Sequence, residues 1–247
     1  FIFIMLGVFT KSAQFPFHFW LPLAMSGPAP VSSFLHSATM VKAGVFLLLR
    51  IFPIYSSFSY WTPTLVSIGG VTMFVGAILC ISQIDLKRVL AYSTVGALGA
   101  LVMLIGYGSE QSLQAALVFL LAHAFYKASL FQIAGNLELS TGNKNLKNLS
   151  NLKSIIPISS IAAIISVLSF IGMPPFIGFY GKELTYLLGL NGSTGGGAIL
   201  LMSFCSFLFM GVMAISFALY PFYKKLSISG EKLSARKLKP SLEISPF

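Results

Sequence analysis

Two ionisable side chains stand four residues apart in the middle of an apolar stretch, His123 and Lys127 within residues 112–137. On a helix, residues four apart share one face and lie about 6 Å apart along the axis. Burial favours the neutral form of a lysine, and a histidine titrates near neutral pH, so the two side chains can act as stations of a proton relay. The alternative is a hydrogen-bonded histidine beside a lysine that extends to the surface.

Prolines accompany two further charged segments. Lys11 stands five residues before Pro16, and Lys182 and Glu183 follow Pro174-Pro175. Proline interrupts a helix, and a lysine at the interruption can alternate between a counter-ion, water and freed carbonyl groups. We therefore include these three charged residues among the candidate proton carriers. The alternative is that each lysine marks the edge of a membrane.

Three more basic residues lie in or beside apolar runs. His36 stands near the start of one run, where it is either a proton carrier or an interfacial histidine. Lys42 follows six residues later, about 120° further round a helix, and no partner for it is evident. Lys87 and Arg88 follow Asp85 in a short polar turn, where the residues alone indicate anchors at a membrane interface.

The elements that position these residues must lie in lipid. Charged residues make up 9% of the 247 and hydrophobic residues 56%, whereas soluble domains average about 25% charged residues. An ionisable residue near the middle of a membrane span costs about 2.5–3.5 kcal/mol, which favours a functional role for those present here. The composition therefore predicts an all-α polytopic transmembrane bundle.

The sequence offers no sign of other chemistry. Cys80 and Cys205 both lie in apolar runs without metal-ligand spacing, and the three histidines are widely separated. We expect no metal, no cofactor and no catalytic nucleophile, hence a transport protein rather than an enzyme in itself. The net charge of +10 comes largely from a polar loop and the C-terminal tail, which argues against nucleic acid as a partner.

Runs of roughly 20 apolar residues, the length that crosses a bilayer, mark the expected spans. Two irregular segments, 1–21 and 155–190, contain prolines and are expected to be broken helices, which in transporters line the pathway. The regular runs are 31–52, 63–83, 89–107, 112–137 and 197–222.

The charges of the connecting loops support seven crossings. With that count, one side of the membrane collects Lys87, Arg88, the basic loop 138–154 and the basic tail, and the other collects Arg50 and Glu110. The positive-inside bias then places the loop and the tail in the cytoplasm. The chain has no initiating Met and starts inside an apolar run, so we expect an N-terminally truncated protein.

Several motifs, in order along nearly the whole chain, resemble the antiporter-like subunits shared by respiratory complex I and the Mrp-type multisubunit sodium/proton antiporters. They are KSAQ (11–14), FHFWLP (17–22), APVS (29–32), HSATMVKAG (36–44), DLKRVLAYST (85–94), HAFYK (123–127) and the stretch from Pro174-Pro175 to Lys182-Glu183. Lysine at position 42 looks more like the large A subunit of the Mrp antiporters than the corresponding complex I subunit.

The resemblance implies a core of fourteen helices with two inverted five-helix repeats, each containing one broken helix. Residues 1–52 would then be the last two helices of the first repeat, 63–222 the second repeat and 223–247 a basic cytoplasmic tail. It also implies that Lys11, His36, Lys127 and Lys182 lie on a hydrated axis of proton carriers, and it favours a functional role for Lys87.

Two departures from the family pattern limit the proton path. Some members carry a second histidine one turn before His123, where this chain has Phe119. The family's glutamate on the fifth helix, the expected partner of Lys11, is absent because that helix is absent.

We therefore expect a proton-translocating subunit of a multisubunit sodium/proton antiporter. Its expected partners are other hydrophobic subunits, the lipid bilayer, protons and monovalent cations, in a bacterial or archaeal cell membrane. One alternative is a proton-pumping subunit of an NADH–quinone oxidoreductase or a membrane-bound hydrogenase. Another is a packing subunit whose lysines are inert.

Overall fold

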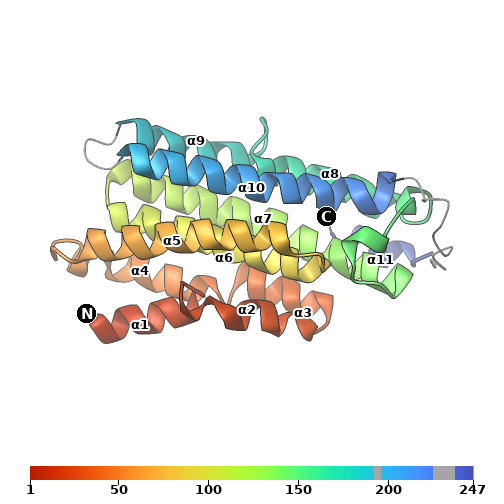
Figure 1. Cartoon of the computed structure of the whole chain (residues 1–247), viewed down its shortest axis with the longest axis horizontal. Helices are drawn as coiled ribbons and strands as arrows, with labels where there is room; N and C mark the ends of the chain where they lie inside the picture. Colours follow the sequence, from red (N-terminus) through yellow and green to blue (C-terminus); the bar gives the residue numbers. More distant parts are fainter. Residues whose placement is uncertain (192–195, 225–236, 247) are drawn as a thin grey trace.

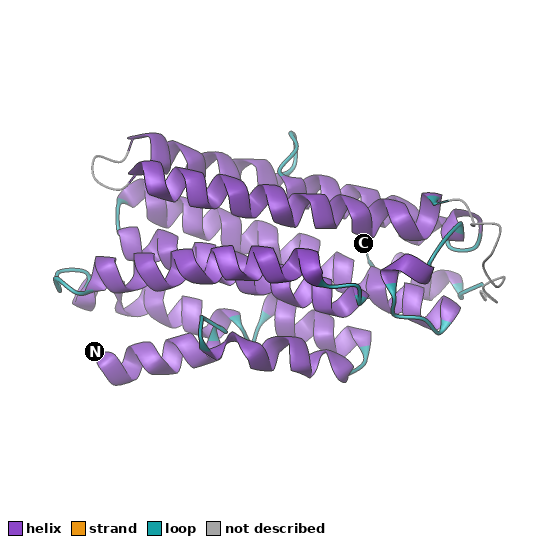
Figure 2. Ribbon diagram, viewed as in Figure 1, coloured by secondary structure: helices purple, strands orange, loops and turns teal. Residues whose placement is uncertain are grey.

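The computed structural model describes residues 1–191, 196–224 and 237–246, and the regular elements within these ranges are helices (Figures 1 and 2). Among these described residues, five helical segments are long and apolar enough to cross a membrane, and two shorter apolar helices, Ile2–Lys11 and Pro157–Ile171, accompany them. The long helices run side by side along the longest axis of the molecule (Figure 1).

The helix α6 (Leu86–Tyr107) occupies the centre of the bundle, with 94% of its most apolar window buried. It packs against α5 (Trp61–Ser82) and α7 (Glu110–Thr141), and α10 (Gly196–Tyr223) covers α5. Glycines allow α5 and α6 to approach closely, because a Cβ at Gly99 would lie 2.7 Å from the carbonyl oxygen of Gly69.

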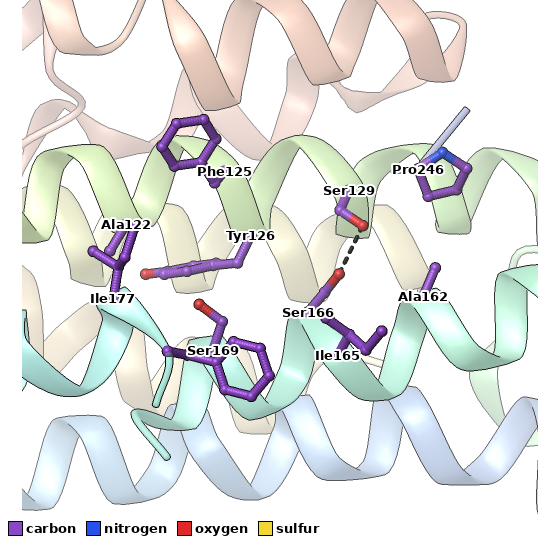
Figure 3. Close-up of a pocket in the computed structure, with 11 residues that line it drawn as sticks. Ala122, Phe125, Tyr126, Ser129, Ala162, Ile165, Ser166, Ser169, Ile177 and Pro246 are labelled. Carbon is purple, nitrogen blue, oxygen red and sulfur yellow. Dashed lines mark hydrogen bonds between the residues drawn. The ribbon is translucent and has the colours of Figure 1, made fainter. Parts of the chain in front are cut away.

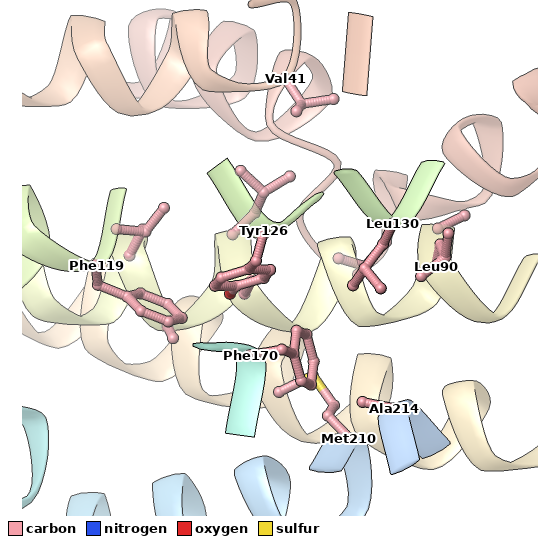
Figure 4. Packing of buried hydrophobic residues seen from close by; sticks show 14 of the residues in the cluster. Val41, Leu90, Phe119, Tyr126, Leu130, Phe170, Met210 and Ala214 are labelled. Atoms are coloured by element: carbon pink, nitrogen blue, oxygen red, sulfur yellow. The ribbon is translucent and has the colours of Figure 1, made fainter. Parts of the chain in front are cut away.

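Apolar side chains of α6, α7 and α10 fill the core around this centre. Figure 4 shows Phe119, Tyr126 and Leu130 of α7 facing Phe170 of the neighbouring helix and Met210 of α10. These side chains form the surroundings of the charged residues in the middle of the bundle.

The first broken helix consists of α1 (Ile2–Lys11) followed by three short helical segments. They are η1 (Phe17–Phe19), α2 (Trp20–Leu23) and η2 (Ala24–Ser26). Between α1 and η1, the backbone N–H of Phe15 donates to the Thr72 hydroxyl of α5 at 2.9 Å. The Gln14 amide donates to the carbonyl of Ser12 at 2.9 Å. The interruption is therefore tolerated because the freed backbone groups find protein partners.

The second broken helix consists of α8 (Pro157–Ile171) and α9 (Ile177–Asn191), separated by the residues around Pro174-Pro175. Gly172 ends α8 with φ 85°, a conformation that glycine adopts without strain. Both predicted helix breaks are confirmed.

The helices α6 and α7 begin earlier than their apolar runs, because polar residues cap them. The Asp85 carboxylate accepts from the N–H groups of Lys87 and Arg88 at 3.0 and 3.1 Å, and the Ser109 hydroxyl caps α7. The predicted runs 63–83, 89–107, 112–137 and 197–222 therefore correspond to α5, α6, α7 and α10.

The helix predicted over 31–52 is interrupted, and that detail of the prediction is wrong. The structure has α3 (Ala29–Ser33), one π-helical turn η3 (Phe34–Ala38) and α4 (Lys42–Tyr55), which together form one candidate span. The Thr39 hydroxyl and the Met40 N–H each reach a carbonyl five residues back, at 3.0 Å. Hydroxyl side chains compete for backbone carbonyls, an effect that apolar composition does not register.

Part of the tail predicted over 223–247 packs against the bundle, whereas residues 225–236 and 247 lie outside the described residues. The short helix α11 (Pro240–Ile244) contacts α8. The Glu243 carboxylate accepts from the N–H of Ile158 at 3.3 Å, and the Asn136 amide donates to the carbonyl of Leu242 at 2.9 Å. The basic loop before α8 contains two short turns, η4 (Leu146–Asn148) and η5 (Leu152–Ser154).

Candidate functional site

Lys127 lies in the middle of α7 and is fully buried. Its Nζ donates to the carbonyl of Leu90 at 2.9 Å and to the hydroxyl of Ser93, both on α6. Among the described residues, ion pairs occur at Lys87 and Lys144 but not at Lys127. The amine is thus held by neutral oxygens inside the bundle, which excludes the alternative in which it extends to the surface.

His123 is also fully buried, on the same face of α7 as Lys127. Its ring packs 5.5 Å from the Tyr126 ring and 6.4 Å from the Phe119 ring, measured between centroids. Neither ring nitrogen has a hydrogen-bond partner among the described residues. The alternative of a histidine held by a protein hydrogen bond therefore finds no support, although no direct bond joins His123 to Lys127 either.

Lys42 joins this group from the other side. It is 7% exposed, and its Nζ donates to the carbonyl of Leu120 on α7 at 3.3 Å, one turn before His123. His123 therefore lies on α7 between Lys127, one turn away, and the carbonyl that Lys42 binds. The sequence identified Lys42 as an expensive intramembrane charge but gave no partner, because the partner is a backbone carbonyl of a helix distant in sequence.

Lys182 and Glu183 are adjacent in the sequence, but their side chains point in different directions. Lys182 is 6% exposed, and its Nζ donates to the carbonyl of Ile171 at the end of α8, at 3.1 Å. This is a carbonyl freed by the helix break, as the sequence analysis expected. Glu183 is exposed on the outside of α9, because consecutive helical residues point about 100° apart.

The ring of Phe170 contacts two buried lysines, Lys127 and Lys182. The Nζ of Lys127 lies 5.3 Å from the ring centroid and the Nζ of Lys182 lies 5.4 Å from it. The same ring packs edge-on against Tyr126, with centroids 5.0 Å apart (Figure 4). The two lysines thus approach one aromatic side chain at the end of α8.

Lys87 is buried in the first turn of α6, so the interpretation of this lysine as an interface anchor is wrong. Its Nζ lies 2.7 Å from a carboxylate oxygen of Glu138 and donates to the carbonyl of Gly27 at 2.9 Å. The other oxygen of Glu138 lies 3.2 Å from Lys144. Sequence reasoning missed Glu138 because it placed this residue in a loop, whereas α7 continues to Thr141. Arg88 is exposed, as an interface residue would be.

The other predicted carriers lie apart from this group. His36 is buried between the rings of Trp20 and Phe131, each with its centroid 6.3 Å away. Lys11, the last residue of α1, is exposed on the side of the bundle.

Lys87 and the two groups that hold Lys127 lie on the same helix, α6. Lys87 belongs to α6, and the two groups that hold Lys127, Leu90 and Ser93, follow it by three and six residues. At 1.5 Å per residue these positions cover about 9 Å of the axis. The described residues contain no group of three or more His, Cys, Asp or Glu side chains placed to hold a metal. The arrangement is suited to moving protons between basic groups.

The family pattern described as NADH:quinone oxidoreductase/Mrp antiporter, transmembrane region, matches residues 1–216. The chain belongs to this family. Together with its apolar helices, membership makes it an integral membrane protein, and the predicted all-α bundle with two broken helices is confirmed.

Curated relatives in the family include bacterial antiporter subunits. The chain is 39% identical over 199 residues to the A subunit of the Na⁺/H⁺ antiporter of Alkalihalophilus pseudofirmus, covering 75% of this chain and 25% of the relative. It is 44% identical over 195 residues to the A1 subunit of a Na⁺/H⁺ antiporter of Staphylococcus aureus, covering 74% and 24%. The A/B subunit of a probable K⁺/H⁺ antiporter of Rhizobium meliloti is 43% identical over 185 residues, covering 75% and 18%. The chain thus spans about a quarter or less of these relatives.

Two solved structures share the fold over 99% of this chain. The Mrp complex from Dietzia sp. DQ12-45-1b matches with a TM-score of 0.86 and 35% identity, over 26% of that chain. Respiratory complex I from Thermus thermophilus matches with a TM-score of 0.85 and 23% identity, over 52% of that chain, and this likeness concerns the fold alone.

Proposed function

We propose that this chain is part of the large A subunit of a multisubunit monovalent cation/proton antiporter, in which it relays protons through the membrane. The observation that carries the proposal is the set of three buried lysines, Lys42, Lys127 and Lys182, each held by a backbone carbonyl. A lysine held by neutral oxygens in an apolar interior can lose its proton without abandoning a carboxylate partner. A lysine in a structural ion pair would instead leave its carboxylate without a partner when it lost its proton.

In the proposed path, protons pass between Lys87 at the cytoplasmic end, Lys127 with His123 in the middle, and Lys182 at the second helix break. Lys42 lies beside His123 and extends the path toward the first half, where His36 and Lys11 belong to the proposed hydrated axis. Glu183 lies outside the bundle, where it is available to a neighbouring subunit.

The proposal includes organisation, partners and location. Residues 1–52 are the end of a first inverted repeat, residues 63–222 are a second repeat, and residues 223–247 form a cytoplasmic tail. Other membrane subunits complete the complex in a bacterial cell membrane, because the matched relatives are bacterial antiporter subunits. Their names include both Na⁺ and K⁺, so the proposed substrate class is a monovalent cation. The higher identity to antiporter subunits than to complex I favours exchange over a redox-driven pump.

The test is cation-driven proton flux in membrane vesicles that carry equal amounts of the complete complex. Lys127→Ala should abolish or nearly abolish the flux while the complex still assembles. His123→Ala should slow it less, because water can bridge one missing station. Lys147→Ala, which removes an exposed loop lysine, is the matched control and should leave flux unchanged. Near-normal flux in Lys127→Ala would refute the relay.

A further inference from the structure

A cleft of about 270 Å³ lies between α7, α8 and the start of α9 (Figure 3). Its walls are apolar for the most part, as expected in a membrane protein. Four hydroxyl-bearing residues also line it: Tyr126, Ser129, Ser166 and Ser169. One water molecule needs about 10–15 Å³ of such space, so the cleft has room for several.

The hydroxyls form a polar strip along the cleft. The Ser166 hydroxyl donates to the Ser129 hydroxyl at 2.6 Å, which links α8 to α7 (Figure 3). Ser169 lies one turn further along α8, and Figure 3 shows its hydroxyl beside the ring of Tyr126. Hydroxyl groups are costly in an apolar environment without hydrogen bonds, so a strip of this kind is suited to water.

The Tyr126 side chain lines the cleft and also packs against the buried His123. Its ring lies 5.5 Å from the His123 ring between centroids, and the next residue in the chain is Lys127. Ala122, which also lines the cleft, is the residue before His123. The unpartnered ring nitrogens of His123 are thus one side chain away from the cleft.

We propose that this cleft is a water site through which the His123–Lys127 pair exchanges protons with the outside of the bundle. A water molecule that carries a proton from the cleft past the Tyr126 ring transfers it to a ring nitrogen of His123 and remains as neutral water. The described residues of the lining offer no carboxylate, imidazole or thiol that would hold a metal, so water is the ligand. This inference rests on the proposed function, because it gives that relay a lateral access route.

The first experiment measures hydration without reference to transport. Ser166→Cys in a cysteine-free version of the complete complex, with Cys80 and Cys205 replaced, is treated in membranes with a small charged methanethiosulfonate reagent. Such reagents attack the thiolate, which forms in water and not in lipid, so labelling should be at least about tenfold faster than at a lipid-facing thiol. The matched control is Ile161→Cys on the same helix, where the native side chain is 56% exposed on the outer surface.

The second experiment connects the cleft to flux. Labelling of Ser166→Cys should reduce proton flux by about half or more, and a reducing agent that removes the label should restore it, whereas labelled Ile161→Cys should keep its flux. Tyr126→Phe, which keeps the ring, should leave the labelling rate at position 166 unchanged. Labelling of Ser166→Cys as slow as that of Ile161→Cys, or labelling without reversible inhibition, would overturn the cleft proposal. Absence of proton flux in the unmodified complex would instead count against the proposed function, while labelling would still report on the cleft.

Discussion

At the scale of single residues, the charged side chains of this protein divide by the kind of partner that holds them. Lys42, Lys127 and Lys182 donate to carbonyl oxygens, whereas Lys87 pairs with a carboxylate. A carbonyl stabilises an ammonium group without fixing its charge, so the first three can alternate between protonation states. A carboxylate fixes the charge more firmly, so Lys87 is expected to act as both a structural and a transport residue.

Replacement of Lys87 tests this dual role. Lys87→Ala leaves Glu138 without its buried partner and frees the carbonyl of Gly27, so it should destabilise the complex by about 1–3 kcal/mol and reduce flux severely. Arg88→Ala, the adjacent exposed residue, is the control and should change neither. Thermal unfolding in detergent and vesicle flux measure the two effects. Equal behaviour of the two variants would show that the pair of Lys87 with Glu138 contributes to neither stability nor flux.

At the scale of elements, glycine determines how closely α5 and α6 pack around the site. A methyl group at Gly99 would meet backbone atoms of α5, whereas one at Gly211 of α10 would meet nothing within 4 Å. Because α6 carries Leu90 and Ser93, displacement of α6 would also displace the groups that hold Lys127.

The same substitution at two glycines should therefore have opposite effects. Gly99→Ala should lower the unfolding temperature of the complex, because the helices must separate. Gly211→Ala should be neutral or stabilising by up to about 1 kcal/mol, the difference in helix propensity. Unfolding temperatures of the two purified complexes in the same detergent give the comparison. A loss of stability at Gly211→Ala equal to that at Gly99→Ala would show that close packing of α5 and α6 is not the reason.

The elements were predictable from sequence where apolar length decides, and less so where hydrogen bonds decide. Runs of about 20 apolar residues and the prolines that interrupt such runs located the spans and both breaks. The π-helical turn before Lys42 was not predicted, because it depends on the Thr39 hydroxyl and a backbone shift. The partner of Lys42 and the pairing of Lys87 with Glu138 were not predicted either, because they join helices that are distant in sequence.

At the scale of the whole molecule, the arrangement of helices fixes which loops share a side of the membrane. Three helices, α5, α6 and α7, separate Ser57 from Lys147, so the two positions should lie on opposite sides (Figure 1). Ser57→Cys and Lys147→Cys in the complete complex should react with an impermeant thiol reagent from opposite faces, with Lys147→Cys reacting from the cytoplasm. Reaction of both from one side would contradict the order of crossings.

Lys11 is an exposed charged residue at the end of the apolar helix α1. The same helix exposes the apolar side chains of Ile2 and Phe3 near its start, and a lysine facing lipid costs about 2.5–3.5 kcal/mol. Lys11→Leu should therefore stabilise the isolated 247-residue chain but reduce proton flux in the complete complex, where the proposed axis uses the amine. Thr10→Leu, the exposed neighbour, is the control and should leave flux unchanged. Unfolding in detergent measures the gain in stability, and flux in vesicles measures the loss of transport. In liposomes, the isolated chain should exchange no cation for protons. Exchange by the isolated chain would contradict the need for partner subunits, and normal flux from Lys11→Leu would contradict the proposed role of Lys11.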